Sequence, residues 1–324
     1  MKTRCQSIFR AAYHSFDRAV YAGAVLLIAV SAQAQNYNFT FTTLDDPLAV
    51  HGTFAWGISG NNIVGYYADT FYTAHGFLYN GSTYTTFDVP FGPYTFAHGI
   101  SGNNIVGTMF TDSYYGFLYN GSTYTTLNDP LAIPMDGMNN GTFAYGISGN
   151  NIVGYYQDSS LNAHGFLYNG STYTTLDVPL SSSTYAQGID GNNIVGYYKD
   201  SINTAHGFLY NGSTYTTLDD PLGIFTFVTG ISGNNIVGFY SDSSDNAHGF
   251  LYDGSTYTTL DDPLAVVGTL PWGIDGNNIV GFYYDASGNV QGFETSIEPV
   301  PEPSTLALAG LSGLSLLLFR SRKN

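Results

Sequence analysis

Aspartate is the residue in this chain whose placement could support chemistry, because it recurs at two fixed places of an internal repeat. Carboxylate oxygens are the ligands that Ca²⁺ prefers, so these aspartates could bind a cation, and Ca²⁺ is the only cofactor that the sequence suggests. The alternative is turn chemistry, since aspartate starts turns by accepting backbone N–H bonds. The first set follows the second expected strand of each copy and holds the candidate metal ligands: Asp69, Asp112, Asp158, Asp200, Asp242 and Asp285. The second set follows the fourth expected strand, at Asp45/Asp46, Asp88, Asp129, Asp177, Asp219/Asp220 and Asp261/Asp262.

Histidine also recurs at one repeat position, where Tyr115 and Gln291 replace it in two copies. Equivalent residues of a ring of repeats lie far apart, so these histidines cannot share one metal ion. We expect them to have a packing or hydrogen-bonding role. His51 and His98 lie elsewhere in the repeat and form no cluster with ligand spacing. The four repeated histidines are His75, His164, His206 and His248.

No catalytic residue is predicted. Glycoside hydrolysis needs two carboxyl groups in different environments, and near-identical copies provide equivalent ones. An asymmetric site would have to come from irregular parts of the chain, which are the insertion at 133–141 with Asp136 and the aromatics Trp56 and Trp272. A carbohydrate-active enzyme with its site on an acidic face is therefore the alternative to a non-catalytic protein.

The repeat is marked by the stretch Gly-Ile-Ser-Gly-Asn-Asn-Ile-Val-Gly, which occurs six times with aspartate in place of serine in two copies. A period of about forty residues indicates that one supersecondary unit has been copied. The copies begin at Gly57, Gly99, Gly146, Gly188, Gly230 and Gly273.

Each copy reads as a four-stranded antiparallel meander. In the third copy the expected strands are 142–147, 151–156, 164–168 and 171–176, and Asn169-Gly170 is a strong hairpin signal. About 42 residues in four strands is the size of one β-propeller blade. A β-solenoid is the alternative.

The ends of the repeat region favour the propeller. An isolated fourth strand at 38–44 precedes the first copy, and the last copy ends after a third strand at 291–295. Pairing the two would close a ring and remove its open edges. We therefore predict a six-bladed propeller of 24 strands over residues 35–297, closed by the N-terminal strand.

This topology also predicts two different faces. The loops after the second and fourth strands share one face and would place 17 carboxylates there, including Asp136 and Asp245. The opposite turns hold only Asp190, Asp253 and Asp275.

Charge excludes one class of partner. Lys199 is the only basic residue between residues 35 and 297, against 21 acidic ones. A body this acidic repels phosphate backbones, so nucleic-acid binding is not expected. The single cysteine, Cys5, leaves this body without a disulfide.

Residues 1–34 have the features of a secretory signal peptide. Four basic residues precede an apolar run at 19–30, and Ala32-Gln33-Ala34 offers small residues to signal peptidase. Cleavage is expected between Ala34 and Gln35. An uncleaved membrane anchor is the alternative.

Residues 298–324 contain Pro301-Glu302-Pro303, an apolar stretch at 306–319 and a basic tail at 320–323. This order resembles the PEP-CTERM sorting signal. The resemblance implies recognition of Pro301, Glu302 and Pro303 by an exosortase in a Gram-negative cell that makes exopolysaccharide. The apolar stretch is short for a span of roughly 20 residues, so a sorting helix that is cleaved or retained is expected. Contact with the membrane is expected only through the two terminal segments.

Residues 53–293 resemble the HAF family of extracellular bacterial repeats, which combine a Gly-Ile turn, Ile-Val-Gly and a His-Ala-Phe-Leu-Tyr strand. Here that strand reads His-Gly-Phe-Leu-Tyr, as in His164–Tyr168. The resemblance implies an exported repeat protein without an assigned reaction. Together these features predict an exported, exosortase-sorted, non-catalytic protein of the cell surface or extracellular matrix, with a structural or adhesive role and with exopolysaccharide or cations as ligands.

Overall fold

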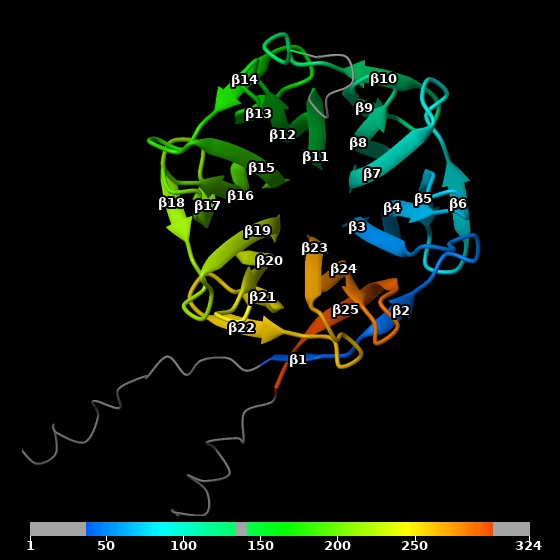
Figure 1. Ribbon diagram of the computed structural model, residues 1–324, viewed down its shortest axis with the longest axis vertical. Helices are drawn as coiled ribbons and strands as arrows, with labels where there is room; N and C mark the ends of the chain where they lie inside the picture. Colours follow the sequence, from blue (N-terminus) through cyan, green and yellow to red (C-terminus); the bar gives the residue numbers. More distant parts are fainter. Residues whose placement is uncertain (1–36, 134–140, 301–324) are drawn as a thin grey trace, which may run out of the picture. The chain divides into compact units, whose positions relative to one another are not determined.

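A computed structural model describes residues 37–133 and 141–300, which form six antiparallel sheets arranged in a ring (Figure 1). The sheets are the blades of a β-propeller, so the predicted fold class is confirmed and the β-solenoid alternative is wrong. Within these residues there is no helix long and apolar enough to cross a membrane.

Each blade is a meander whose first strand lies nearest the axis and whose last strand lies at the periphery (Figure 1). Blade 1 consists of β3 (Thr53–Ser59), β4 (Asn62–Ala68), β5 (Ala74–Tyr79) and β6 (Tyr84–Phe87). Blade 2 consists of β7 (Tyr94–Ser101), β8 (Asn104–Phe110), β9 (Tyr114–Tyr119) and β10 (Tyr124–Leu127). Blade 3 consists of β11 (Thr142–Ser148), β12 (Asn151–Gln157), β13 (Ala163–Tyr168) and β14 (Tyr173–Leu176). Blade 4 consists of β15 (Ser183–Asp190), β16 (Asn193–Lys199), β17 (Ala205–Tyr210) and β18 (Tyr215–Leu218). Blade 5 consists of β19 (Phe225–Ser232), β20 (Asn235–Ser241), β21 (Ala247–Tyr252) and β22 (Tyr257–Leu260).

Blade 6 closes the ring, because it combines strands from both ends of the propeller. Its strands are β23 (Thr269–Asp275), β24 (Asn278–Tyr284), β25 (Val290–Pro299), β1 (Tyr37–Phe39) and β2 (Thr42–Leu44). Both N-terminal strands pair antiparallel with β25, β2 with its first half and β1 with its end. The predicted closure is therefore confirmed. The expected single strand at 38–44 is two short ones, which makes 25 strands in the described residues. Strand β25 continues to Pro299, beyond the expected boundary at residue 297.

The core lies between blades and is built from the repeated apolar residues. The phenylalanine of each third strand is almost completely buried, as at Phe166 in β13. It packs across the glycine of the neighbouring second strand, where a Cβ on Gly154 would lie 2.9 Å from the Phe166 ring. Each cluster also draws on the preceding blade, so that Val106 of blade 2 packs with Ile152 and Phe166 of blade 3.

A second set of contacts links the blades at the Gly-Asn-Asn turns. The turn glycine of each blade donates its backbone N–H to the serine or aspartate that ends the first strand of the preceding blade. The two aspartates give the shortest bonds, 2.6 Å from Gly60 to Asp275 and 2.7 Å from Gly233 to Asp190. The other four bonds join Gly102 to Ser59, Gly149 to Ser101, Gly191 to Ser148 and Gly276 to Ser232. All six junctions of the ring are therefore bridged in the same way.

Several predicted features lie outside the described residues. They are the signal peptide at 1–34 with its cleavage site Ala34/Gln35, the insertion residue Asp136, the sorting motif Pro301-Glu302-Pro303 and the apolar stretch at 306–319.

Candidate functional site

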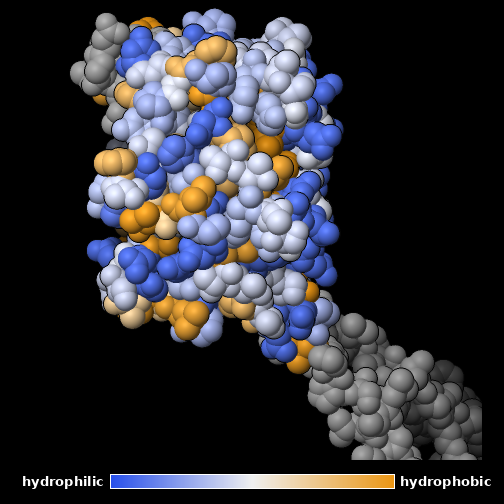
Figure 2. Space-filling view, turned by 90° about the vertical axis from the view of Figure 1, so that its right-hand side faces the viewer, coloured by the Kyte–Doolittle hydropathy of each residue, from blue (hydrophilic) through white to orange (hydrophobic). Residues whose placement is uncertain are grey.

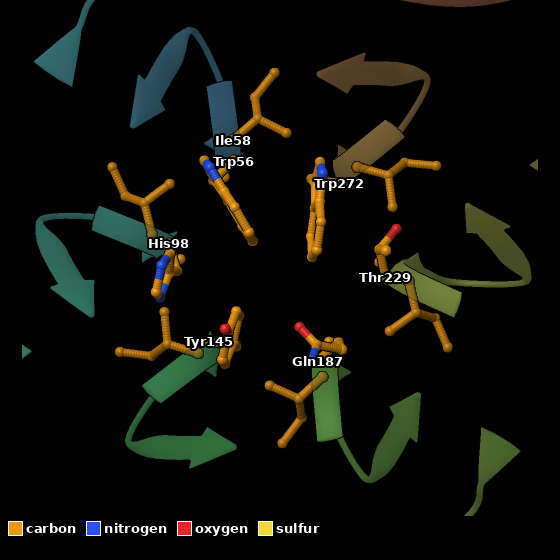
Figure 3. A pocket seen from close by; sticks show the side chains of 18 residues that line it. Trp56, Ile58, His98, Tyr145, Gln187, Thr229 and Trp272 are labelled. Atoms are coloured by element: carbon orange, nitrogen blue, oxygen red, sulfur yellow. The ribbon is translucent and has the colours of Figure 1, made fainter. Parts of the chain in front are cut away.

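The propeller axis is lined by one residue from the first strand of each blade, and these six residues are of five different types (Figure 3). All occupy the same repeat position, immediately before the glycine of the Gly-Ile pair, within a stretch that is otherwise nearly identical. They are Trp56, His98, Tyr145, Gln187, Thr229 and Trp272.

A β-bulge explains why this position faces the axis. Each first strand shifts register at this position, as between Ala144 and Gly146 in blade 3, so the intervening residue has no partner on the second strand. A bulge re-aims the side chain of its extra residue. Here it turns Tyr145 and its five equivalents toward the centre of the ring (Figure 3).

The axial residues form an aromatic half and a polar half. The rings of Trp56 and Trp272 lie 3.8 Å apart between centroids, and His98 stacks on Tyr145 at 4.4 Å with an interplanar angle of 4°. Trp56 also contacts His98, with 4.7 Å between ring centroids. The polar half consists of Gln187 and Thr229 (Figure 3).

Two of the axial side chains are held by backbone carbonyls. His98 Nδ1 donates to the Ala144 carbonyl at 3.0 Å, and Thr229 Oγ1 donates to the Pro271 carbonyl at 2.9 Å. Burial of His98 lowers the pKa of its imidazole to about 4, so the ring is neutral at physiological pH. Burial likewise raises the pKa of Tyr145 to about 12, which keeps its phenol protonated.

Beyond this ring, on the side of the Gly-Asn-Asn turns, the axis is lined by the Gly-Ile pairs. The axial pocket holds about 70 Å³, and its walls include the six Gly-Ile pairs, such as Gly57-Ile58. Toward the other face, between blades 1 and 3, a cavity of about 340 Å³ adjoins Trp56, His98 and Tyr145. Only this second space is large enough for a small organic molecule.

Polar atoms without a hydrogen-bond partner are concentrated around these two spaces. Buried polar groups are normally paired, so an unpaired one needs an explanation, such as a missing ligand or water. Within the described residues eight buried side-chain polar atoms have no partner. Five of them line the axial pocket or the cavity: Trp56 Nε1, Thr108 Oγ1, Gln157 Oε1, Gln187 Oε1 and Trp272 Nε1.

The predicted metal candidates lie far out in the blades, in the loops between second and third strands. Asp158 Oδ1 accepts the backbone N–H groups of Ser160 and Asn162, at 2.8 and 3.0 Å. Burial raises the pKa of Asp158, but these bonds outweigh it and lower the pKa overall. Asp69, Asp200, Asp242 and Asp285 accept two backbone N–H bonds in the same way, while the shorter loop of Asp112 has a bond from Thr111 Oγ1.

The repeated histidines bridge the two acidic loops, which confirms that they have a hydrogen-bonding role. His164 lies 2.9 Å from Asp177 through Nδ1 and 3.4 Å from Asp158 through Nε2. His75, His206 and His248 make the same two contacts. The two carboxylates contact opposite nitrogens of the histidine ring. They therefore cannot bind one metal ion together with the histidine. In residues 37–133 and 141–300 no group of three or more such side chains could hold a metal ion.

The face that carries these loops is less acidic than predicted. Four of its aspartates are buried, and burial raises the pKa of each carboxyl group. Each accepts the backbone N–H of the leucine two residues later, as Asp46 does from Leu48 at 2.9 Å. Of the 17 carboxylates predicted for this face, Asp46, Asp129, Asp220 and Asp262 are therefore buried and add little to its surface charge.

The same face exposes apolar side chains. One follows the proline after each fourth strand, and Leu180 is the most exposed at 98%. In Figure 2 the apolar residues gather toward one rim of the propeller wall, and the opposite rim is hydrophilic. The six exposed residues that follow these prolines are Leu48, Phe91, Leu131, Leu180, Leu222 and Leu264.

The hypothesis that the loops after the second strands bind Ca²⁺ remains a prediction, and titration with Ca²⁺ tests it. Each loop carboxylate already accepts hydrogen bonds within its own loop, so we expect Ca²⁺ to leave the Tm of the purified protein unchanged. Asp158→Asn keeps an acceptor for the loop and removes the charge, so it serves as the matched control. A Ca²⁺-dependent rise in Tm that this variant reduces would instead assign the loop to cation binding.

Sequence reasoning singled out Trp56 and Trp272 but not the axial ring that contains them. It also treated His98 as an isolated residue, whereas His98 belongs to this ring. The available signal was variation within the repeat, because this position changes in a stretch that is otherwise copied. His51 does lie apart, stacked on Tyr72 with 3.7 Å between ring centroids.

Comparison with solved structures supports the fold. The SapL1 lectin, solved in complex with α-methyl fucoside, is similar with a TM-score of 0.51 and 12% identity, covering 79% of this chain and 98% of the lectin. A triple mutant of AofleA from Arthrobotrys oligospora has a TM-score of 0.51 and 10% identity, covering 82% of this chain and 91% of that protein. The six-bladed fungal lectin of Aleuria aurantia follows with a TM-score of 0.49 and 13% identity, at 79% and 99% coverage. At these identities the similarity concerns the fold alone. A sequence search of curated proteins found no match.

A family model matches the C-terminal end of the chain. Residues 299–323 fit the description "PEP-CTERM protein-sorting motif", as the Pro-Glu-Pro triplet, the apolar stretch and the basic tail predicted. The chain is therefore a six-bladed β-propeller that carries a PEP-CTERM sorting motif, which indicates an exported protein that is processed by exosortase.

Proposed function

We propose that this protein binds exopolysaccharide without catalysis, at the surface of a Gram-negative cell or in its extracellular matrix. Signal peptidase would cleave it between Ala34 and Gln35, and exosortase would act at Pro301-Glu302-Pro303. The terminal segments would provide its only contact with the membrane, and its role would be structural or adhesive.

The observation that carries this proposal is the chemistry of the axial ring. Aromatic faces stack on the C–H faces of sugar rings, and unpaired donors and acceptors bind sugar hydroxyl groups. The ring supplies both, since Trp56 and Trp272 have free Nε1 groups and Gln187 has a free Oε1. Such a surface suits a neutral, hydroxyl-rich ligand.

The alternative of a carbohydrate-active enzyme is disfavoured by the position of the acids. A glycosidase needs two carboxyl groups on either side of the scissile bond. Within the part of the chain that the structure describes, the residues that line the axial pocket and the adjoining cavity include no aspartate or glutamate. The loop aspartates on the outer face are engaged in turns and histidine contacts, as at Asp158.

Co-sedimentation with insoluble polysaccharide, combined with an assay for new reducing ends, tests the proposal. We expect binding without release of reducing ends. Trp272→Ala should weaken binding at least about fivefold, because a tryptophan anchor commonly contributes more than about 1 kcal/mol. Its Tm is measured alongside to show that the fold is retained. Release of reducing ends would support the enzyme, and absence of binding would contradict the proposal.

A further inference from the structure

The cavity of about 340 Å³ beside the axis, here the Thr108 cavity, is asymmetric in an otherwise repetitive molecule. It is lined by residues of blades 1, 2 and 3, among them Trp56, Phe96, Thr108, Tyr114, Phe143 and Gln157. Its volume lies at the lower end of the roughly 300–1,000 Å³ typical of small-molecule sites.

The cavity is present because blade 2 lacks one aromatic ring. In four blades the aromatic residue two positions before the axial residue stacks on an aromatic of the second strand, as Phe143 does on Tyr155 at 4.6 Å. In blade 2 the strand partner of Phe96 is Thr108. The missing ring leaves one face of Phe96 uncovered and opens space toward the axis. The equivalent residues elsewhere are Tyr66, Tyr155, Tyr197, Phe239 and Phe282.

A second departure from the repeat lies in the same cavity. Tyr114 begins β9, where blades 1, 3, 4 and 5 have alanine. Its ring packs against Phe143 of blade 3, with 5.1 Å between centroids. Thr108 and Tyr114 are separate departures from the repeat, and both line the same cavity. Random divergence of the repeats does not explain this coincidence.

The polar groups of the cavity lack partners. Thr108 is only 2% exposed, and its Oγ1 has no hydrogen-bond partner. Gln157 Oε1 and Trp56 Nε1 share this cavity and are also unpaired. A buried hydroxyl without a partner is unfavourable, so its retention points to a ligand that supplies the partner.

We propose that the Thr108 cavity binds one uncharged sugar residue, either at the end of a polysaccharide chain or as a free saccharide. The proposal rests on the function proposed above and names the site and the ligand class. Seven tryptophan, tyrosine and phenylalanine side chains offer faces for stacking, and one unpaired donor and two further unpaired polar groups can bind hydroxyls. Among the described residues the lining contains no cationic or acidic side chain, and the surrounding body is strongly acidic, so a uronic acid would be repelled.

The test is titration of the purified protein with neutral sugars, followed by calorimetry and tryptophan fluorescence. The probes are glucose, galactose, mannose, rhamnose, N-acetylglucosamine and cellotriose, each to about 10 mM, which reaches millimolar Kd. Galacturonic acid is the anionic comparison. We expect binding of at least one neutral probe, quenching of tryptophan fluorescence through Trp56, and no binding of galacturonic acid.

The decisive variant is Thr108→Tyr, which restores the ring that other blades have at this position. It should fill the cavity, retain or raise the Tm, and weaken binding of the neutral probe about tenfold or more. Thr108→Val keeps the space and removes only the hydroxyl, so it should weaken binding severalfold. Phe239→Tyr at the same position of blade 5 is the matched control and should bind as the unchanged protein does.

The outcomes separate the two proposals. Equal binding of the probe by the unchanged protein and Thr108→Tyr would overturn the cavity as the site while leaving polysaccharide binding intact. Binding of no neutral probe, or preference for galacturonic acid, would also overturn it. Failure of the function proposed above would show instead as an unchanged protein that binds no insoluble polysaccharide. If a monosaccharide binds as tightly as cellotriose, the free saccharide is the source, and a clear preference for cellotriose indicates a chain end.

Discussion

Gly154→Ala should lower the Tm of the propeller by roughly 8 °C, although it adds a single methyl group. The new Cβ would clash with the Phe143 carbonyl oxygen and would lie 2.9 Å from the Phe166 ring. Neither neighbour can retreat, because one is strand backbone and the other is a fully buried core residue. Overpacking of this kind costs up to about 3 kcal/mol, and each kcal/mol shifts the Tm of a large domain by about 2–4 °C.

Gly149→Ala is the matched control. Gly149 lies in the turn of the same blade with φ +60, and a Cβ there would meet no atom within 4 Å. Only the strain of a left-handed alanine remains, about 1–2 kcal/mol. Thermal unfolding followed by circular dichroism compares the two variants. If Gly149→Ala proves as destabilising as Gly154→Ala, close packing of the third-strand phenylalanine on this glycine does not explain the repeat.

The fold could be predicted because its determinants are local and are repeated six times. The Asn-Gly hairpin and the Gly-Asn-Asn turn mark the strand ends in each copy, and the complementary ends at 38–44 and 291–295 indicate a ring. The split of the N-terminal strand into β1 and β2 was not predictable, since it depends on the course of β25 along the edge of blade 6. The common face of the loops after the second and fourth strands, which the repeated histidines bridge, followed directly from the meander.

The candidate site was less predictable, because its features depend on contacts between blades. Asp45 and Asp46 are adjacent acids, and only the structure shows that Asp46 is buried. The bulge that turns Tyr145 to the axis has no proline or turn signal of its own. The Thr108 cavity arises from a ring that is missing beside Phe96, and its consequence appears only when neighbouring blades are in place.

Acidification should destabilise the propeller because the unfolded chain binds a proton at His98. Replacement of His98 by glutamine should abolish this contribution. Burial lowers the pKa of His98 to about 4, against 6.5 for an ordinary histidine. Its surroundings are the rings of Trp56 and Tyr145 and the Ala144 carbonyl, and none of them carries a charge. Between pH 6.5 and 4 the unfolded chain therefore binds a proton at His98 that the folded chain does not. The free energy of unfolding falls as pH falls through this window, by about 2 kcal/mol between pH 7 and 4.5.

Other groups titrate in the same pH range. The prediction therefore concerns the difference in free energy of unfolding between His98→Gln and the unchanged protein. Glutamine occupies this position in blade 4, which makes His98→Gln a substitution that the repeat already tolerates. Urea unfolding at pH 7 and 4.5 should show that His98→Gln gains about 2 kcal/mol relative to the unchanged protein on acidification. His164→Gln should behave oppositely: burial lowers the pKa of His164, but Asp177 and Asp158 outweigh it and raise the pKa. The stability that His164 contributes is complete below pH 6.5 and is lost as pH rises through its raised pKa, so this variant should be more costly at pH 6 than at pH 8. A constant difference between His98→Gln and the unchanged protein at both pH values would mean that His98 is accessible to protons in the folded state.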